Sequence, residues 1–312
     1  MKIALINYDH FDTVIGGVET RYRLLGRALT AAGHECKYVA TEAMCLERMI
    51  VEVSSCDLAI ADSAVGYSTI CPMITIFGNA WRGVLSCRPG NTHIESVVHR
   101  ETLWHRKHQS FRVAVSNYIK EKEMLPNGIL ADSVVPNPAD LSRFPNPVKK
   151  DSPRTILWVG PFIDIKNPTV MNEVRDLVDD IYKGQIQWKY ACRNDATMRR
   201  DYNAMTECMG AASLVLCTSV AEGCSNTMME AMAADVPIVT TSCGLFWDWW
   251  DPRIGVRITA NESVAELVAG IQKVLDNPDQ FAPRQVALDH KLDYDSWVAK
   301  WSKIVEFYSV QL

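Results

Sequence analysis

The chain has 312 residues, which is enough for about two domains that each bury a full core without disulfides or metals. Its composition, 48% hydrophobic and 22% charged, excludes a mainly disordered protein. The formal net charge of −5 shows no overall excess of positive charge, so a nucleic-acid partner would need a local basic patch.

The ten cysteines form no CxxC pair and no Cys/His spacing typical of zinc sites, so we interpret them as reduced and packed. The apolar run Ile3–Ile6 is too short for a signal peptide. No stretch approaches the ~20 apolar residues of a membrane span. We therefore expect a cytoplasmic protein with no transmembrane segment.

The first half of the chain alternates short apolar runs with helical patterns. Tyr22, Leu25, Leu29 and Ala32 recur at helical spacing, and Gly33 is placed to end that helix. A polar helix is expected over Asn117–Met124. Strands are expected over Ile3–Ile6, Cys36–Ala40, Leu58–Ala61, Met73–Phe77, Phe111–Val115 and Ser133–Val135. This order predicts a parallel sheet covered by helices on both faces.

The segment Pro136–Pro153 carries five prolines and little periodicity, which indicates a linker. The alternation then restarts, with strands expected over Thr155–Val159, Gln185–Ala191, Ser213–Cys217 and Ile238–Thr241. A final helical pattern covers Tyr294–Val310. We therefore predict an N-terminal domain over 1–145, a second α/β domain over 151–294, and a C-terminal helix over 295–312 that packs back on the first domain.

Two glycine-bearing turns are candidates for anion binding at helix N-termini. Gly16-Gly17 precedes the first helix, but without a full GxGxxG pattern it is equally well a plain tight turn. The second turn, Ala221–Thr227, opens a helix after a strand. Thr227 and Glu230 also have the spacing of a capping box, so Glu230 has a purely structural alternative.

Four segments resemble motifs of one enzyme family, in the family's order and across nearly the whole chain. Glu222–Val239 resembles E-x7-E with E-A-M-A-x-G-x-P-V-V, and Ile15–His34 resembles G-G-V-E with a helix ending in G-H. Val134–Asp140 resembles V-I-P-N-G-V-D, and Ile156–Asn167 resembles I-L-x-V-G-R-x-x-x-x-K-G. The chain thus resembles the retaining glycosyltransferases of the GT-B fold, of the group 1 type and similar to family 4.

The resemblance implies two Rossmann-like, doubly wound parallel-sheet domains facing a central cleft. Lys166 would contact the diphosphate of a nucleotide-sugar donor, Glu222 would lie near the transferred sugar, and Glu230 would accept hydrogen bonds from ribose hydroxyls. Further donor contacts would come from Gly16, Gly17, Gly223, Cys224, Ser225, Asn226 and Thr227. No metal or cofactor is implied, because Lys166 and helix dipoles would stabilise the charge on the departing diphosphate.

The chain departs from the family at Pro161, where an arginine would share the diphosphate with Lys166. Arg193, after the strand 185–191, or Arg82 would supply that charge, and the alternative for either is a surface arginine without a ligand. The family often has a histidine after the strand Met73–Phe77, where this chain has Gly78-Asn79. Asn79 would hydrogen-bond a sugar hydroxyl there, so we place it with Lys166 and Glu222 as a catalytic candidate. Asp235 stands at the glycine position that ends the helix after Glu230.

The segment 99–122 concentrates arginines, lysines and histidines together with Trp104 and Phe111. It is either a solvated basic helix face or an acceptor-side surface for an anionic partner, which would be a lipid-linked or nucleic-acid acceptor or a membrane surface.

The sequence therefore predicts a metal-independent retaining glycosyltransferase that moves a hexose-like sugar from a nucleoside diphosphate to an acceptor hydroxyl. A glycan, a lipid-linked sugar or a nucleic acid all remain open as the acceptor. Two alternatives also remain open. One is a nucleotide-sugar binding protein with little catalysis, and the other is a sugar-nucleotide epimerase of related fold.

Overall fold

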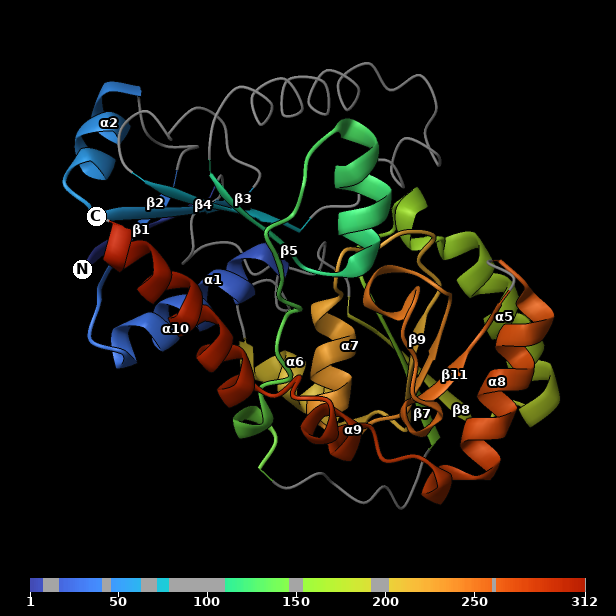
Figure 1. Ribbon diagram of the computed structural model, residues 1–312. Helices are drawn as coiled ribbons and strands as arrows, with labels where there is room; N and C mark the ends of the chain where they lie inside the picture. Colours follow the sequence, from blue (N-terminus) through green and yellow to red (C-terminus); the bar gives the residue numbers. More distant parts are fainter. Residues whose placement is uncertain are drawn as a thin grey trace. The chain divides into compact units, whose positions relative to one another are not determined.

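The computed structural model describes residues 1–7, 17–40, 46–62, 72–78, 110–145, 154–191, 202–259 and 262–311. They form two compact units (Figure 1). The first unit holds the described residues up to Asn137 and those from Asp295 onward, and the second holds Pro138–Tyr294. The contacts thus place the boundary at Asn137/Pro138, whereas the proline pattern places it near residue 145.

The first unit is built on a six-stranded parallel sheet with the order β2-β1-β3-β4-β5-β6. Its apolar runs form central strands because they are buried on both sides: Ile3–Ile6 and Leu58–Ala61 are almost fully enclosed. The elements are β1 (Lys2–Asn7), α1 (Gly17–Ala31), β2 (Glu35–Ala40), α2 (Leu46–Ser54), β3 (Leu58–Asp62), β4 (Met73–Phe77), β5 (Phe111–Ala114), β6 (Ser133–Val134) and α10 (Tyr294–Gln311).

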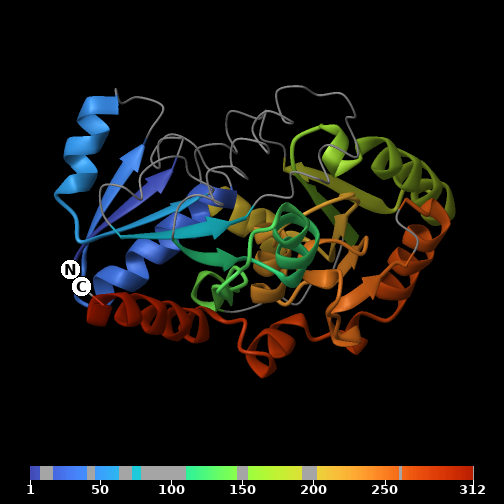
Figure 2. The same ribbon diagram turned by 45° about the horizontal axis from the view of Figure 1, so that its top comes forward.

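Helices cover both faces of this sheet. Figures 1 and 2 show α2 on one face, with α1 and α10 on the other. The C-terminal helix α10 is fixed by Tyr308, whose hydroxyl donates to the carbonyl of Met73 at 3.3 Å and whose ring lies 5.9 Å from that of Phe111. The last helix of the chain is thereby part of the first unit.

The second unit holds a five-stranded parallel sheet with the order β11-β10-β9-β7-β8. In both ribbon views α5 and α8 cover one face, and α6 and α7 cover the other. Val174 of α5, Ile271 of α8 and Trp158 of β7 meet in its core. The elements are β7 (Arg154–Val159), α5 (Pro168–Tyr182), β8 (Ile186–Ala191), α6 (Tyr202–Ala211), β9 (Leu214–Cys217), α7 (Asn226–Ala233), β10 (Ile238–Thr240), β11 (Gly255–Arg257), α8 (Val264–Asp276) and α9 (Pro283–Asp289).

Residues 138–145 correct the linker interpretation, because they are docked on the second unit. The Ala139 N–H donates to the carbonyl of Leu292 at 2.8 Å. Asp140 caps a short 3₁₀ turn, η3 (Leu141–Arg143), by accepting from the Ser142 N–H at 3.2 Å. Phe144 is 5% exposed. The prolines remove helical and strand periodicity, but they leave a segment whose side chains still pack.

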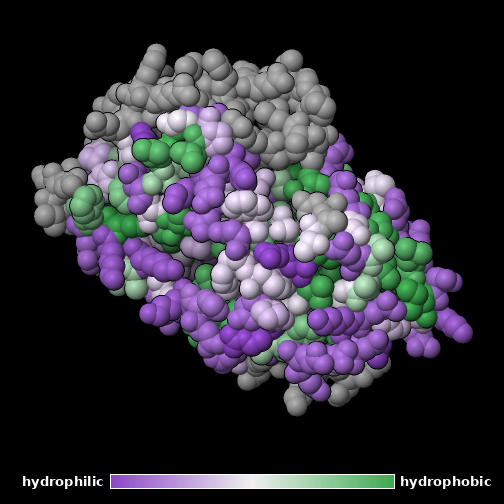
Figure 3. Space-filling view, turned by 45° about the vertical axis from the view of Figure 1, so that its right-hand side comes forward, coloured by the Kyte–Doolittle hydropathy of each residue, from purple (hydrophilic) through white to green (hydrophobic). Residues whose placement is uncertain are grey.

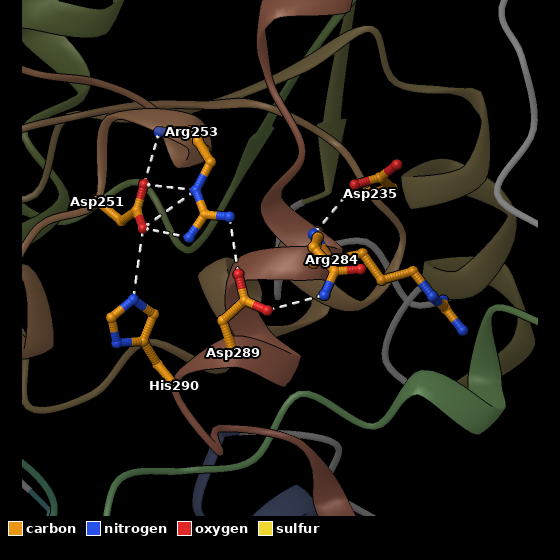
Figure 4. Close-up of polar contacts among 7 residues, drawn as sticks. Asp235, Asp251, Arg253, Arg284, Asp289 and His290 are labelled. Carbon is orange, nitrogen blue, oxygen red and sulfur yellow. Dashed lines mark hydrogen bonds and ion pairs between the residues drawn. The ribbon is translucent and has the colours of Figure 1, made fainter.

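A polar network ties the last elements of the second unit together (Figure 4). Arg253 contacts Asp251 and Asp289, each at 2.7 Å, and His290 lies 3.4 Å from Asp251. Hydrogen bonds from Arg253 lower the pKa of Asp251 to about 2. The network joins the turn before β11 to α9.

Arg284 of α9 extends away from that network in Figure 4. Its backbone N–H donates to Asp235 at 3.0 Å, and its guanidinium donates to the carbonyls of Phe144, at 2.6 Å, and Ala233. Asp235 has a left-handed backbone with φ of 59°, which aspartate tolerates better than most residues. Arg284 therefore joins the end of α7 to the segment 138–145.

Hydrophobic side chains form several separate patches among hydrophilic ones on the face seen in Figure 3. In the parts of the chain described above, no helix is long and apolar enough to cross a bilayer.

Candidate functional site

The candidate site lies at the carboxyl ends of β9 and β10, beside the start of α7. This helix begins at Asn226, and its N-cap Ser225 makes no side-chain capping bond. The capping-box alternative for Thr227 and Glu230 is wrong, because the N-cap is Ser225 and Thr227 lies inside the helix, while Glu230 is bound to Arg143. The Ser225 side chain therefore does not cap the first turn of α7, which lies at the positive end of the helix dipole.

Lys166 reaches this edge from the turn η4 (Asp164–Lys166) after β7. Gly160 makes the approach possible: its φ is +147°, and a Cβ built on it would lie 3.2 Å from three methylene carbons of Lys166. A side chain at position 160 would therefore press on the lysine chain. Pro161, which follows, brings no charge to this edge.

Lys166 and Glu222 form an ion pair. The Glu222 carboxylate also accepts a hydrogen bond from the Ser219 hydroxyl at 2.8 Å. The two charged side chains are 21% and 16% exposed, so both are half-buried but can still be reached by a ligand. A cation and a carboxylate are thus held together beside the N-terminus of α7.

The neighbourhood keeps Lys166 charged. Burial acts to lower the pKa of its ammonium group, but the charges of Glu222 and Cys217 outweigh it, and the net pKa is raised above the ordinary lysine value. A hydrogen bond with Cys243 lowers the pKa of the adjacent Cys217 thiol. Lys166 therefore offers a positive charge at every pH in the neutral range.

Two threonines fix the backbone around the pair. The Thr218 hydroxyl donates to the carbonyl of Lys166 at 2.7 Å and accepts from the Trp158 indole N–H at 3.1 Å. Thr241 donates to the carbonyl of Ser219. Because Trp158 is fully buried in the core, this chain of bonds connects the position of Lys166 to the packing of β7.

Gly244 closes the other side of the Glu222 loop. Its φ is +57°, and a Cβ there would lie 2.9 Å from both the Cβ of Glu222 and the carbonyl oxygen of Gly223. The turn after β10 can therefore lie directly on the Glu222 loop only because residue 244 has no side chain.

Glu230 lies in the middle of α7, and its carboxylate is bound by Arg143. Arg143 donates to Glu230 through one guanidinium nitrogen and to the Thr206 hydroxyl through another, the latter at 3.0 Å. Burial raises the pKa of Glu230, and Arg143 opposes that rise. The carboxylate proposed for ribose recognition is thus part of an ion pair.

The structure brings together most of the residues that the sequence indicated in the second unit. Lys166 and Glu222 are in contact, and the loop and first turn of α7 place beside them Gly223, Cys224, Ser225, Asn226 and Thr227. Gly17 begins α1 in the first unit. Gly16, Asn79 and Arg193 lie outside the described residues, as does the part of the basic segment from 99 to 109.

Sequence reasoning missed Ser219, Thr218 and Arg143. Ser219 lies three residues before Glu222 and could have been suggested by that proximity. Arg143 is 87 residues from Glu230, and no local pattern joins them. Among the described residues, no group of three or more His, Cys, Asp or Glu side chains could hold a metal ion.

Several solved structures share this arrangement of two parallel sheets with flanking helices. Sucrose-phosphate synthase from Thermosynechococcus elongatus matches with a TM-score of 0.76 and 13% identity over 100% of both chains. Anabaena HepE, solved with UDP and glucose, matches with a TM-score of 0.69 and 13% identity over 98% of this chain and 99% of its own. WaaG, a glycosyltransferase involved in lipopolysaccharide biosynthesis, matches with a TM-score of 0.68 and 14% identity over 97% and 99% of the two chains.

These matches define the fold as that of the GT-B glycosyltransferases. Residues 176–277 match the family model of the glycosyl transferases group 1. The matched segment lies in the second unit and contains Glu222 and Glu230 but begins after Lys166. No curated protein sequence matches the chain significantly.

Proposed function

We propose that the protein is a retaining, metal-independent glycosyltransferase that moves a sugar from a nucleoside diphosphate to an acceptor hydroxyl. The observation that carries the proposal is the half-buried contact of Lys166 with Glu222 beside the uncapped start of α7. The group 1 segment and the fold support the same reaction class.

Lys166 would bind the donor diphosphate. Breaking the bond between the anomeric carbon and the diphosphate oxygen leaves the electron pair on the leaving group. A fixed ammonium group and the N–H groups of Gly223–Thr227 would stabilise that growing charge more than the ground state. Gly16 and Gly17 of the first unit, and Arg193, belong to the same proposal as further diphosphate contacts.

Glu222 would orient the transferred sugar and stabilise its positive character, with Asn79 hydrogen-bonding a sugar hydroxyl. Retention would follow if the acceptor oxygen bonds to the anomeric carbon on the face that the diphosphate leaves. The acceptor proton would then pass to the departing phosphate oxygen, so that Glu222 need act as neither acid nor base. Glu230 would accept hydrogen bonds from the ribose hydroxyls.

The first test is a thermal-shift screen with UDP, GDP and ADP, because a ligand that binds only the folded state raises the melting temperature. Release of nucleoside diphosphate from the matching sugar nucleotide then tests transfer. We expect Lys166→Ala and Glu222→Ala to abolish that release. Lys273→Ala, on the exposed side of α8, is the matched control and should retain it.

The alternatives give different results in the same experiment. A binding protein with little catalysis, which is favoured by Pro161 at the arginine position, predicts stabilisation without release for any acceptor. An epimerase predicts an altered sugar still attached to its nucleotide, which NMR detects. Excess EDTA tests metal independence: unchanged release supports it, and a loss restored by a divalent cation contradicts it.

The acceptor side of the proposal rests on the segment 99–122. We propose that it contacts an anionic acceptor or a membrane surface, for an enzyme that works in the cytoplasm. Charge reversal at Arg106 and Lys107 should then weaken acceptor use and its salt dependence while donor affinity stays the same. Unchanged acceptor use in the reversed variant would identify a solvated face.

A further inference from the structure

Arg143 belongs to the segment 138–145, which precedes the turn, the loop and the helix that carry Lys166, Glu222 and Glu230. It ends the turn η3, which Asp140 caps and which Arg284 fixes through the carbonyls of Leu141, at 3.3 Å, and Phe144, at 2.6 Å. Its guanidinium carbon lies 5.5 Å from the ring centre of the adjacent Phe144. The position of Arg143 is therefore set by the packing of the whole segment 138–145.

The guanidinium group bridges two helices. One nitrogen donates to Oε1 of Glu230 on α7, and the other donates to the hydroxyl of Thr206 on α6 at 3.0 Å. The Arg143 side chain is 7% exposed and that of Glu230 is 16% exposed. Because a planar guanidinium has a fixed fork of donors, the second bond to Thr206 restricts how Arg143 can hold Glu230.

Only one oxygen of Glu230 is engaged in this way. Among the described residues, no hydrogen bond reaches its Oε2 atom. The charged group that acts on Glu230 is Arg143; α6 contributes the neutral Thr206, and the side chain of Arg284, on α9, bonds to backbone carbonyls. Glu230 therefore has one oxygen bonded to Arg143, while its side chain remains 16% exposed.

We infer that Arg143 is a positioning residue that holds Glu230 through Oε1 and directs Oε2 to the ribose diol of the nucleotide. The inference rests on the proposed function, and it adds a residue from outside the matched family segment 176–277. Carboxylate oxygens only accept hydrogen bonds, and a 2′,3′-diol offers two O–H donors. A 2′-deoxyribose offers one fewer, so a correctly held Glu230 distinguishes the two nucleotides.

The experiment compares each ribonucleoside diphosphate with its 2′-deoxy form. Dissociation constants are measured by calorimetry for the pair UDP and dUDP, or for the guanosine or adenosine pair if that base binds. We expect the unaltered protein to prefer the ribonucleotide by about 10- to 100-fold, as for a hydrogen bond to a charged group. Arg143→Met should reduce that ratio to about threefold or less, mainly by weakening the ribonucleotide.

Three further variants make the result specific. Glu230→Gln should lower the ratio as Arg143→Met does, and adding Arg143→Met to it should lower the ratio no further. Thr206→Val, which removes the second anchor of Arg143, should lower it partly. Arg154 is an exposed arginine at the start of β7, and it lies 3.6 Å from Asp276. Arg154→Met should leave the ratio unchanged.

The failures are distinguishable. If no nucleoside diphosphate binds, the proposed function and this inference both fail. If the ribonucleotide binds but is not preferred, or if Arg143→Met keeps the preference, the inference fails and the proposed function stands. An equal loss of both nucleotides in Arg143→Met would show a purely structural role and would also overturn the inference. If Arg143→Met does not fold, the same ratio of dissociation constants is measured for Arg143→Lys and Thr206→Val. Full retention of the ribonucleotide preference in both variants overturns the inference.

Discussion

Each sheet carries an ion pair at its carboxyl edge, and the two pairs differ in how far they are buried. In the first unit Arg21 of α1 contacts Asp62, the last residue of β3, at 2.6 Å, and their side chains are 5% and 6% exposed. In the second unit Lys166 and Glu222 are 21% and 16% exposed. Chemically similar pairs therefore lie in clearly different surroundings.

The difference separates a structural pair from a candidate site. Arg21 is enclosed so tightly that a Cβ on Gly78 would lie 2.4 Å from one of its nitrogens. Beside it, the buried Asn7 donates to Glu19 at 2.9 Å, which also fixes α1 to the end of β1. The enclosed pair offers a ligand little surface, whereas Lys166 and Glu222 are partly exposed.

The largest effect should come from breaking the enclosed pair. Arg21→Met leaves Asp62 buried without its countercharge, so we expect the free energy of unfolding to fall by about 3–5 kcal/mol. Urea denaturation followed by circular dichroism measures this change. A loss below about 1 kcal/mol, which is typical of solvent-exposed pairs, would remove the distinction between the two edges.

Substitutions in the half-buried pair Lys166–Glu222 should lower activity more than stability. For Lys166→Met and Glu222→Gln we expect nucleoside diphosphate release to fall by about 10²- to 10³-fold, as when one fixed electrostatic contact to a transition state is removed. The melting temperature of each variant should change far less than that of Arg21→Met. A large stability loss with normal release per folded molecule would show that this pair, too, is structural.

An intermediate effect is expected at Thr218, which connects Lys166 to the core. Thr218→Val leaves the buried indole N–H of Trp158 without its acceptor and the carbonyl of Lys166 without a donor, and we expect a stability loss of about 1–3 kcal/mol. Donor affinity, measured by calorimetry, should also weaken because Lys166 is less well positioned. Thr259→Val, which removes an exposed hydroxyl bonded to Glu266, is the control and should change neither property.

The smallest effect is expected at Asp251, whose partner Arg253 has a side chain that is 43% exposed. Asp251 has its pKa lowered to about 2 by hydrogen bonds from Arg253, so its carboxylate stabilises the fold above the unfolded pKa of about 3.9. That contribution is lost as the pH falls toward 2. Asp251→Asn should therefore cost about 1 kcal/mol at pH 7, after screening by solvent, and nothing once the pH is well below 2. A difference from the unaltered protein that stayed constant with pH would contradict this assignment.

The apolar runs predicted most of the fold, because buried parallel strands are almost continuous stretches of hydrophobic residues. Met73–Phe77 is a strand with the expected bounds, and the strand expected over Ile3–Ile6 extends by one residue at each end. The strand β11 was missed, since its three residues, Gly255–Arg257, contain one apolar side chain. Hydrophobic pattern alone does not find a short strand that is defined by its parallel pairing with a neighbour, here β10.

The candidate residues Lys166 and Glu222, which the structure places in contact, could be identified from the sequence because they stand in recognisable strings. Arg143 was not, because prolines flank it and its partner Glu230 belongs to another element far along the chain. An ion pair between two such segments depends on their docking, here on Arg284 and the burial of Phe144. The local amino-acid composition therefore does not predict that docking.

The attachment of residues 138–145 to the second unit decides where the chain can be divided for expression. A fragment that starts after the proline-rich stretch would remove Arg143, leaving Glu230 buried without its countercharge and Arg284 without the carbonyls of Leu141 and Phe144. A fragment over 138–294 keeps all of these bonds. The natural first residue of the isolated second unit is thus Pro138.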